Sequence, residues 1–391
     1  MFFTILGAGY LVYLGLYTIL LCVSDCDVQL FFLEKLGKSP RRLKGQVVFI
    51  TGASSGIGEF TAYALAKCGV KLVLTARRPY ELERVKNKCI ELSKGSLQHN
   101  DVLIIPMDVT DFASHRRHFQ HAVNHFGRVD ILLNNAGRSQ RAAWESIELD
   151  VDRQMFDLNV FGVINLTRVA LEHFEKVGKG HVAVVSSLAG VFGAPYSGTY
   201  TATKHAIHGY YNSLRNEKMG KNLHVTLLCP GPTFTNFLQE CFTGKDGQNL
   251  NSSVQPTDRR MTAERCGYLN AVALVNKTRE SWMAIFPVTL FTYCAVYCPM
   301  LFYWGVKIIG PDIIFKMREG RKEPYTVWIR KWYRRQLRLV YYYFKYIVSQ
   351  KPVKQLVKTQ SSIRQQESNY KSLITSWYDF GGIVPQILPI F

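Results

Sequence analysis

The chain has 391 residues and a formal net charge of +19 at pH 7, which arises from 48 Lys and Arg against 29 Asp and Glu. This length supports one large hydrophobic core, or one domain with appendages. The nine cysteines form no CxxC pair and no cluster with histidine, which gives no disulfide framework and argues against a structural zinc site. Residues 316–391 carry 15 Lys and Arg against 4 Asp and Glu, so the basic charge belongs mainly to this tail.

The first predicted element is an uncharged apolar helix. Residues 2–23 contain no charged side chain and, as a helix, are long enough to cross a hydrocarbon core of about 30 Å. A cleavable signal peptide is the alternative, but it would need a basic segment before a shorter apolar run of about 7–15 residues. We therefore predict that residues 1–35 are a retained, single-pass membrane anchor. Because five Lys and Arg follow the span between residues 35 and 44 and none precedes it, the positive-inside rule places the following domain in the cytosol.

A soluble α/β domain is predicted over residues 43–281. Short apolar segments rich in β-branched residues alternate with helix-length segments, such as the charged amphipathic stretch at 80–93. The predicted strands are residues 46–51, 70–76, 102–108, 129–135, 181–187 and 224–231. Near-continuous apolar strands separated by helices indicate a parallel sheet with helices on both faces. The predicted fold class is therefore α/β, a doubly wound parallel sheet of the Rossmann type.

The loop after the first predicted strand is rich in glycine. Gly52, Gly56 and Gly58 lie in TGASSGIG (51–58), between that strand and a helical pattern. Glycine permits a tight turn and the close approach of backbone N–H groups to a pyrophosphate at the helix N-terminus. A glycine-rich loop alone is weak evidence, but its position between a strand and a helix predicts a dinucleotide site.

Tyr200 and Lys204 are four residues apart in YTATKHAI (200–207). On a helix they would lie on one face, where the ammonium stabilises a phenolate and lowers the pKa of the phenol towards the range in which it transfers protons. A lone spacing of this kind is more typical of an ordinary surface pair, so its interpretation depends on the rest of the chain.

Several separated motifs occur in a fixed order along the chain. They are TGxxxGxG at 51–58, NNAG at 134–137, Asn159, Ser187, Tyr200, Lys204 and PGPTFT at 230–235, with Ser187 placed 13 residues before Tyr200. In these motifs the chain resembles the short-chain dehydrogenase/reductase superfamily, from about Leu43 to Trp282. The stretches TARRPYELERVKNKC, NNAGRSQR and CPGPTFTNF most resemble the branch that contains dehydrogenase/reductase member 7 and the membrane-bound 11β-hydroxysteroid dehydrogenases.

The resemblance implies roles for individual residues. Tyr200 would give a proton to the substrate oxygen during reduction or remove it during oxidation, and Lys204 would lower the phenol pKa and bind the nicotinamide ribose. Ser187 would bind the reacting substrate oxygen, and Asn159 would hold a water that links Lys204 to solvent. Ser186 is the adjacent alternative to Ser187, but the spacing favours Ser187, and Ser186 would point to the other face of the strand. The residues predicted to bind the cofactor are Gly52, Ser54, Ser55, Gly56, Ile57, Gly58, Arg77, Asp108, Asn135, Ala136, Gly137, Tyr200, Lys204, Pro230, Gly231 and Thr235.

The end of the second predicted strand indicates which cofactor binds. NAD enzymes place a carboxylate about 20 residues beyond the glycine turn, whereas an arginine accommodates the 2′-phosphate of NADP. The sequence has Arg77 and Arg78 there and no acid, so we predict NADP(H) rather than NAD(H). Two solvated arginines at the start of a helix are the alternative. Asp108 resembles the adenine contact of the superfamily, and its alternative role is a helix cap.

The remaining segments are apolar, basic or histidine-rich. Residues 282–306 lack charge but contain Pro287 and Pro299, so residues 282–315 are predicted to be either a membrane-associated segment near the substrate entrance or core helices that cover the pocket. Residues 316–391 are predicted to be a basic, loosely ordered tail that contacts anionic membrane lipids. Nucleic-acid binding is the alternative for the tail, but no recognition module accompanies the charge. The histidines of residues 115–126 recur at helical spacing without cysteine or acidic partners, which predicts a solvated helix face and no metal site.

These features together predict a membrane-anchored, NADP(H)-dependent oxidoreductase that transfers a hydride to or from a carbonyl or secondary alcohol. A lipophilic substrate such as a steroid or retinoid is expected, because an anchored enzyme lies beside the bilayer in which such molecules concentrate. Location in the endoplasmic reticulum membrane, a role in lipid metabolism and a homodimer are further expectations. The alternative from another class is a catalytically silent, nucleotide-binding membrane scaffold, which has no need of the complete set of Ser187, Tyr200 and Lys204.

Overall fold

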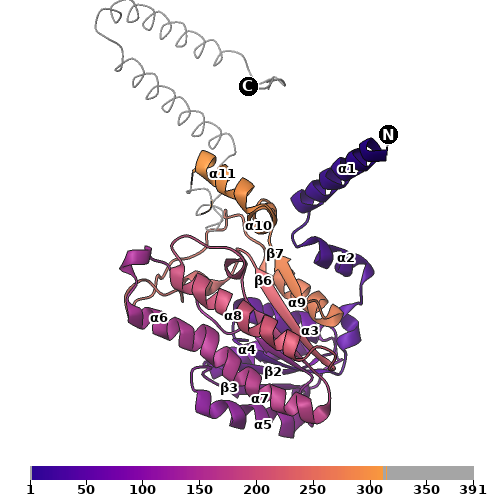
Figure 1. Cartoon of the computed structure of the whole chain (residues 1–391). Coiled ribbons are helices and arrows are strands. Elements are labelled where there is room, and N and C mark those ends of the chain that lie inside the picture. Colours follow the sequence, from indigo (N-terminus) through magenta and orange to yellow (C-terminus); the bar gives the residue numbers. More distant parts are fainter. Residues whose placement is uncertain (1, 311–313, 315–391) are drawn as a thin grey trace, which may run out of the picture. The chain divides into compact units, whose positions relative to one another are not determined.

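A parallel sheet of seven strands forms the centre of the fold (Figure 1). The computed structural model describes residues 2–310 and residue 314, so the predictions for residues 316–391 lie outside the described residues. The strands are β1 (Val47–Thr51), β2 (Lys71–Ala76), β3 (Val102–Pro106), β4 (Ile131–Asn134), β5 (Gly180–Val185), β6 (Leu223–Pro230) and β7 (Glu280–Met283). Their order is β3-β2-β1-β4-β5-β6-β7, and every neighbouring pair is parallel. The prediction of a doubly wound parallel sheet is confirmed.

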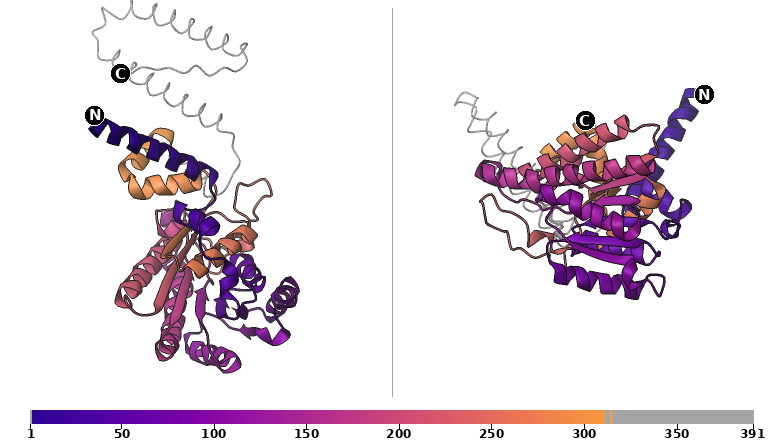
Figure 2. Two further views of the ribbon diagram at one scale, coloured as in Figure 1. Left: turned by 90° about the vertical axis from the view of Figure 1, so that its right-hand side faces the viewer. Right: turned by 90° about the horizontal axis from the view of Figure 1, so that it is seen from below.

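Helices cover both faces of this sheet (Figures 1 and 2). One face packs against α3 (Gly56–Ala66), α4 (Pro79–Leu92) and α9 (Ala263–Asn276), and the other against α5 (His115–Phe126), α7 (Gly162–Val177) and α8 (Gly198–Glu217). Alternate residues of a strand enter opposite layers: Val48 and Ile50 of β1 lie in the first core, and Val47 and Phe49 in the second. Burial on both faces explains why the strands are continuous apolar runs in the sequence.

Strand β7 is the one strand of the sheet that the sequence analysis missed. The six predicted strands are present, and their ends differ from the prediction by at most two residues. The seventh has only four residues, ESWM, and lies directly before the long apolar segment, so its short pattern merges with that segment. It also crosses the predicted domain boundary between residues 281 and 282.

The N-terminal residues form two helices with different surroundings. Helix α1 (Phe2–Val23) is exposed along most of its length, and among the residues that the structure describes it alone is long and apolar enough to cross a membrane. Helix α2 (Val28–Leu36) instead packs against α9 and β7. Just before it, Cys26 is fully buried and forms an isolated bridge with β7. Residues 24–36, most of which the predicted anchor range 1–35 includes, therefore belong to the folded domain.

The apolar segment after β7 folds as α10 (Val288–Tyr297) and α11 (Pro299–Ile309). The start of α10 is buried, whereas much of α11 is exposed, including Met300 at 67% and Leu301 at 72%. Tyr293 of α10 contacts Tyr17 of α1 with ring centroids 5.7 Å apart, and Figure 2 shows α1 beside the two short helices. Helix α11 is therefore not a core helix that covers the pocket. The alternative, membrane association of this segment, stays a prediction.

The histidine-rich helix α5 departs from the predicted solvated face at its first residue. His115 is fully buried, with Nε2 at 3.1 Å from the Val109 carbonyl oxygen and Nδ1 at 3.0 Å from Nδ2 of Asn165. Because both ring nitrogens have partners, the first turn of α5 can bury the imidazole against α7. Within the described part of the chain, no three His, Cys, Asp or Glu side chains are grouped in a way that could hold a metal ion.

Candidate active site

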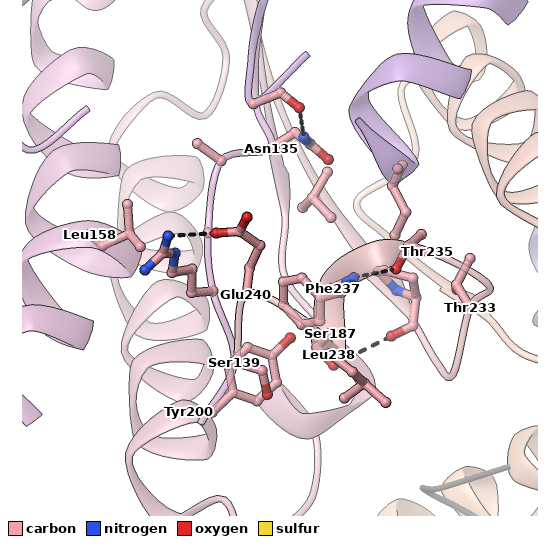
Figure 3. Close-up of a pocket in the computed structure, with 18 of the residues that line it drawn as sticks. Asn135, Ser139, Leu158, Ser187, Tyr200, Thr233, Thr235, Phe237, Leu238 and Glu240 are labelled. Atoms are coloured by element: carbon pink, nitrogen blue, oxygen red, sulfur yellow. Dashed lines mark hydrogen bonds and ion pairs between the residues drawn. The ribbon is translucent and has the colours of Figure 1, made fainter. Parts of the chain in front are cut away.

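A cleft of about 730 Å³ opens at the carboxyl ends of the strands. It lies where the strand order reverses between β1 and β4, the usual position of a ligand in a doubly wound sheet. All the residues predicted to bind the cofactor line this cleft except Gly58. In the view of Figure 3, Phe237 lies between Asn135 and Tyr200, with Thr235 to the right and Leu238 below.

The glycine turn forms one wall of the cleft. Gly52 and Gly56 have φ angles of +65° and +60°, which side chains with a Cβ rarely adopt. Gly58 lies behind the turn, where a Cβ would be 2.4 Å from the carbonyl oxygen of Gly52, so its role is close packing of the helix on the turn. Helix α3 begins here, and its N-cap Ser55 makes no side-chain hydrogen bond to the first turn. The first N–H groups of α3 thus lack a side-chain cap, as a phosphate site at a helix N-terminus requires.

Asn135 and Thr51 hold the glycine turn against the loop after β4. The backbone N–H groups of Asn135 and Ala136 both donate to the Thr51 hydroxyl at 3.0 Å. The Asn135 side chain donates in turn to the carbonyl oxygens of Thr51 and Gly52, also at 3.0 Å. These bonds connect two loops that are more than 80 residues apart in the sequence and fix the width of the cleft between them.

Ser187, Tyr200 and Lys204 come together at the other end of the cleft. Tyr200 and Lys204 lie on α8, with the Lys204 ammonium 5.7 Å from the centre of the Tyr200 ring. Ser187 follows β5, and its hydroxyl donates to the Pro230 carbonyl oxygen at 3.4 Å and acts to lower the pKa of the Tyr200 phenol. The Ser186 hydroxyl instead lies 3.0 Å from Nε2 of His208. The choice of Ser187 over Ser186 thus agrees with the geometry. Tyr200 and Lys204 are only 8% and 5% exposed, so they are not an ordinary surface pair.

Burial shifts the pKa values of Tyr200 and Lys204 in the direction that favours the neutral form of each side chain. It raises the pKa of Tyr200, while the hydrogen bond from Ser187 and the charge of Arg141 oppose this rise. Burial lowers the pKa of Lys204 to about 8, so the ammonium is still mostly protonated at neutral pH. Its Nζ donates to the Val185 carbonyl oxygen at 3.0 Å. The predicted lowering of the phenol pKa by Lys204 stays a prediction.

Asn159 lies outside the cleft lining and holds a loop in place. It belongs to a π-helical turn, η5 (Asp157–Phe161), which joins α6 (Leu149–Phe156) to α7. Its side chain accepts from the Arg138 N–H and donates to the Arg138 carbonyl oxygen, both at 2.9 Å, and donates to the Thr203 hydroxyl at 3.1 Å. Asn159 thereby connects α8, which carries Tyr200, to the loop after β4. Its predicted role in holding a water stays a prediction.

Arg77, Arg78 and Asp108 line the end of the cleft beyond the glycine turn. The Asp108 carboxylate accepts from the backbone N–H and the hydroxyl of Thr110 at 2.9 and 2.7 Å. Partial burial works to raise the pKa of Asp108, but the Thr110 hydrogen bonds and the charge of Arg77 keep it below its usual value. Asp108 therefore stabilises a local turn and is ionised at the cleft. The predicted helix cap is wrong, because the N-caps of the two helices that follow are Asp111 and Ser114. The predicted adenine contact stays a prediction.

The sequence analysis missed the side chains that close the cleft over Tyr200. Arg138 and Glu240 form an ion pair of 2.6 Å, and the Phe237 ring packs against Tyr200 with centroids 6.1 Å apart. Arg141 also lines the cleft. Their positions could not be inferred from local sequence patterns, because the partners lie 37 to 102 residues apart. The only available signal was that Arg138 and Arg141 directly follow the NNAG motif.

The fold and this site define a dinucleotide-dependent oxidoreductase, and comparisons with known proteins specify the family. A model of the short chain dehydrogenase family matches residues 46–246. Dehydrogenase/reductase SDR family member 7 of Homo sapiens is 38% identical over 299 residues, which cover 76% of this chain and 87% of the relative. Member 7B of Rattus norvegicus is 30% identical over 274 residues, or 70% of this chain and 84% of the relative. The chain therefore belongs to the short chain dehydrogenase family.

A solved structure supports the fold assignment independently. It is an alcohol dehydrogenase from the archaeon Thermococcus sibiricus, complexed with 5-hydroxy-NADP, with a TM-score of 0.54 and 24% identity. The match covers 62% of this chain and 97% of that chain. The catalytic domain thus has the whole fold of that enzyme, and this chain has further residues outside the match.

Proposed function

We propose that the protein is a membrane-anchored oxidoreductase that transfers a hydride between NADP(H) and a lipophilic carbonyl or secondary alcohol. The observation that carries this proposal is the arrangement of Ser187, Tyr200 and Lys204 in one cleft with the glycine turn. A nucleotide-binding scaffold would need the turn but not a buried phenol and ammonium with a serine hydroxyl beside them at the far end.

The geometry assigns each catalytic side chain a step. NADP(H), when bound in the cleft, would supply or accept the hydride. Tyr200 donates its phenolic proton to the substrate oxygen in reduction and accepts it in oxidation. Ser187, whose hydroxyl acts to lower the pKa of Tyr200, would be a second donor to that oxygen. Lys204, buried behind the phenol, supplies a positive charge that stabilises the tyrosinate left after proton transfer.

The proposal of NADP(H) rests on the arginines at the end of β2. Arg77 and Arg78 line the cleft, and no acid follows β2 at the position where NAD enzymes have one. The archaeal alcohol dehydrogenase of the same fold was solved with an NADP derivative, which supports the proposal. Arg77→Asp should shift the preference towards NADH, because it removes a phosphate partner and adds repulsion. A wild-type protein that binds NADH more tightly than NADPH would show that this reading of Arg77 is wrong.

The proposal of a lipophilic substrate rests on the wall of the cleft near Tyr200. Leu188, Phe192, Phe237 and Leu238 line the cleft there, together with Val288, the first residue of α10. The rest of α10 packs against α1, the helix that is apolar enough to cross a membrane. A substrate dissolved in the bilayer would thus reach the cleft along α10, whereas a water-soluble substrate gains nothing from this arrangement.

A substrate screen with purified full-length protein tests the proposal. Oxidation of NADPH is followed by absorbance with a panel of steroids, retinoids and small hydrophilic carbonyls. We expect kcat/KM to be highest for steroids or retinoids. A kcat/KM for small hydrophilic carbonyls equal to or above that for the lipophilic compounds would refute the substrate class. NADPH binding without turnover of any compound would favour the scaffold.

A further inference from the structure

One segment crosses the cleft from the glycine turn to the catalytic tyrosine. Residues 235–242, here called the cover segment, follow β6 and include the short helix η7 (Asn236–Leu238). At its start, the Thr235 methyl group is so close to the glycine turn that a Cβ on Gly56 would lie 3.2 Å from it. In its middle, Phe237 packs edge-on against the Tyr200 ring. A ligand that filled the cleft between these two points would lie against the cover segment.

The far end of the cover segment is attached to the loop after β4. The backbone N–H of Phe242 donates to the Ser139 carbonyl oxygen, and the N–H of Arg141 donates to the Phe242 carbonyl oxygen, both at 2.9 Å. An ion pair between Arg138 and Glu240 also connects the cover segment to the loop after β4, at a point between Phe237 and Phe242. Figure 3 shows it as the dashed line at Glu240. It joins the two sides of the cleft, since both residues line it.

The two partners of this ion pair differ in how firmly they are held. Both backbone groups of Arg138 are hydrogen-bonded to Asn159, and its guanidinium lies 5.0 Å from the centre of the Phe242 ring. The Arg138 side chain is 18% exposed and that of Glu240 is 47% exposed. Arg138 is thus held in place by other contacts. The Glu240 side chain is the partner that can leave the ion pair and be solvated by water.

We propose that Arg138 and Glu240 form a clasp that holds the cover segment over the cleft, so that parting of this ion pair limits how fast the cofactor leaves. This inference rests on the proposed function in assuming that the cleft binds NADP(H). Both are positioning residues, since neither needs to touch the reacting atoms to hold the segment. The cofactor must leave after each turnover, and release or lid opening often limits kcat in enzymes with such a cover.

A different role for Arg138 would be direct binding of an acidic substrate. The two roles predict opposite effects of removing the Glu240 charge. Glu240→Gln would free Arg138 to bind an anion and improve the KM of an acidic substrate. In the clasp, both changes should accelerate release of the cofactor. Arg138→Gln should do so at least as much as Glu240→Gln, because it also removes the contact of the guanidinium with the Phe242 ring of the cover segment.

The test measures the dissociation rate of NADPH by stopped-flow fluorescence in the full-length protein. We expect Glu240→Gln and Arg138→Gln each to accelerate dissociation about two- to fivefold, the upper part of the range for one partly exposed ion pair. The rate of the hydride step in a single turnover should stay within about twofold, because Tyr200, Ser187 and Lys204 are untouched. The double variant Arg138→Glu with Glu240→Arg exchanges the two charges. Its NADPH dissociation rate should return part of the way to the wild-type rate, as expected in a double-mutant cycle when the two residues are in contact. Unchanged dissociation in Glu240→Gln, or a smaller effect of Arg138→Gln than of Glu240→Gln, would overturn the clasp.

Glu172→Gln is the matched control. It removes the carboxylate of an Arg–Glu pair of the same length, 2.6 Å to Arg116, between α5 and α7, and neither residue lines the cleft. NADPH dissociation should be unchanged in this variant. If it accelerates as much as in Glu240→Gln, the effect is a general one of charge and the clasp is refuted.

Hydrogen exchange separates failure of the clasp from failure of the proposed function. In the protein alone, amides of residues 236–242 should exchange faster in Glu240→Gln than in the wild type, with no change in α5. If wild-type protein does not bind NADPH, the proposed function fails, and exchange still decides whether the ion pair holds the segment. Equal exchange in the two proteins would refute the clasp even where NADPH binds.

Discussion

At the catalytic centre, burial acts on both groups that handle the proton. It raises the pKa of the Tyr200 phenol and lowers that of the Lys204 ammonium, so each is held nearer to its neutral form than in water. A tyrosinate formed during proton transfer therefore depends on nearby positive charge and hydrogen bonds. Lys204, Ser187 and Arg141 are the side chains placed to supply them.

Tyr200→Phe removes the proton donor and keeps the aromatic ring. We expect kcat to fall by about 10²–10⁴, the usual contribution of general acid catalysis. Thermal stability and NADPH affinity should stay close to those of the wild type, because the ring still fills its place beside Phe237. Steady-state kinetics and thermal unfolding of the same preparation measure both effects, and near-normal turnover would refute the assigned mechanism.

Lys204→Met should separate activity from stability. In the folded protein the pKa of Lys204 is about 8, below its ordinary value of 10.5, so the unfolded state holds the proton more tightly. Charged Lys204 therefore costs stability at pH 7, and the free energy of unfolding contributed by this residue rises as pH increases from about 8 to 10.5. We expect the variant to be inactive but more stable than the wild type at pH 7.

The same comparison at high pH checks the sign. The stability difference between Lys204→Met and wild type should shrink between pH 8 and pH 10, because the wild type no longer buries a charge. Urea unfolding at several pH values measures it, and other groups that titrate in this range cancel in the difference. A variant that is less stable than wild type at every pH would contradict the shift.

At the scale of elements, the short connection between α1 and the sheet holds the edge of the fold. Asp27 is buried. Its carboxylate accepts a hydrogen bond of 2.8 Å from the Leu30 N–H at the start of α2 and one of 2.6 Å from the Trp282 N–H of β7. Arg265 of α9 donates two hydrogen bonds to Asp25 and two to Glu34. These contacts close the edge of the sheet at β7, which would otherwise present unpaired backbone groups.

Two truncations test this division of the N-terminus. Removal of residues 1–23 should leave thermal stability close to that of the full chain, since α1 is mostly exposed. Removal of residues 1–35 should lower the free energy of unfolding by about 3 kcal/mol or more, because it exposes the Leu30 site and leaves Arg265 and the Trp282 N–H without their partners. Thermal unfolding in detergent measures both, and equal stability of the two truncations would show that α2 is not part of the fold.

The sequence predicts the elements whose residue pattern lies within one continuous stretch and is long enough to be recognised. The six apolar strands and the glycine turn each follow from a short stretch with one hydrophobic pattern or one φ requirement. The choice of Ser187, 13 residues before Tyr200, follows instead from the resemblance to the superfamily. Strand β7 was missed because four residues carry too little pattern, and α2 was assigned to the anchor because its partners lie on α9, over 200 residues away. The Arg138–Glu240 pair was missed for the same reason. The positions of β7, α2 and this ion pair depend on packing between segments that are far apart in the sequence. A short stretch of sequence carries no information about such contacts.

At the scale of the whole molecule, the exposed apolar residues are concentrated on α1, α10 and α11. On α10 and α11 they include Tyr297, Met300, Leu301, Tyr303 and Trp304, each at least 50% exposed. Helix α11 has 11 residues, a length of about 16 Å, so it could enter one leaflet but not cross a bilayer. The Lys307 ammonium lies 4.8 Å from the centre of the Trp304 ring, and such cationic and aromatic side chains are typical of the membrane–water interface.

Membrane attachment should therefore survive the loss of α1. We expect the protein without residues 1–23 to stay with the membrane fraction after alkaline carbonate extraction, because α11 still offers its apolar face. Adding Leu301→Glu and Trp304→Glu should release it, since a carboxylate at these exposed positions would have to be buried among acyl chains. The matched control is Leu149→Glu with Met219→Glu, the same change at apolar residues that are 61% and 73% exposed on the catalytic domain. Release by the control pair as well would mean that added negative charge alone detaches the protein. A truncated protein that is soluble and monodisperse without detergent would contradict the membrane contact of α11, and with it the route along α10 by which a lipophilic substrate is proposed to reach Tyr200.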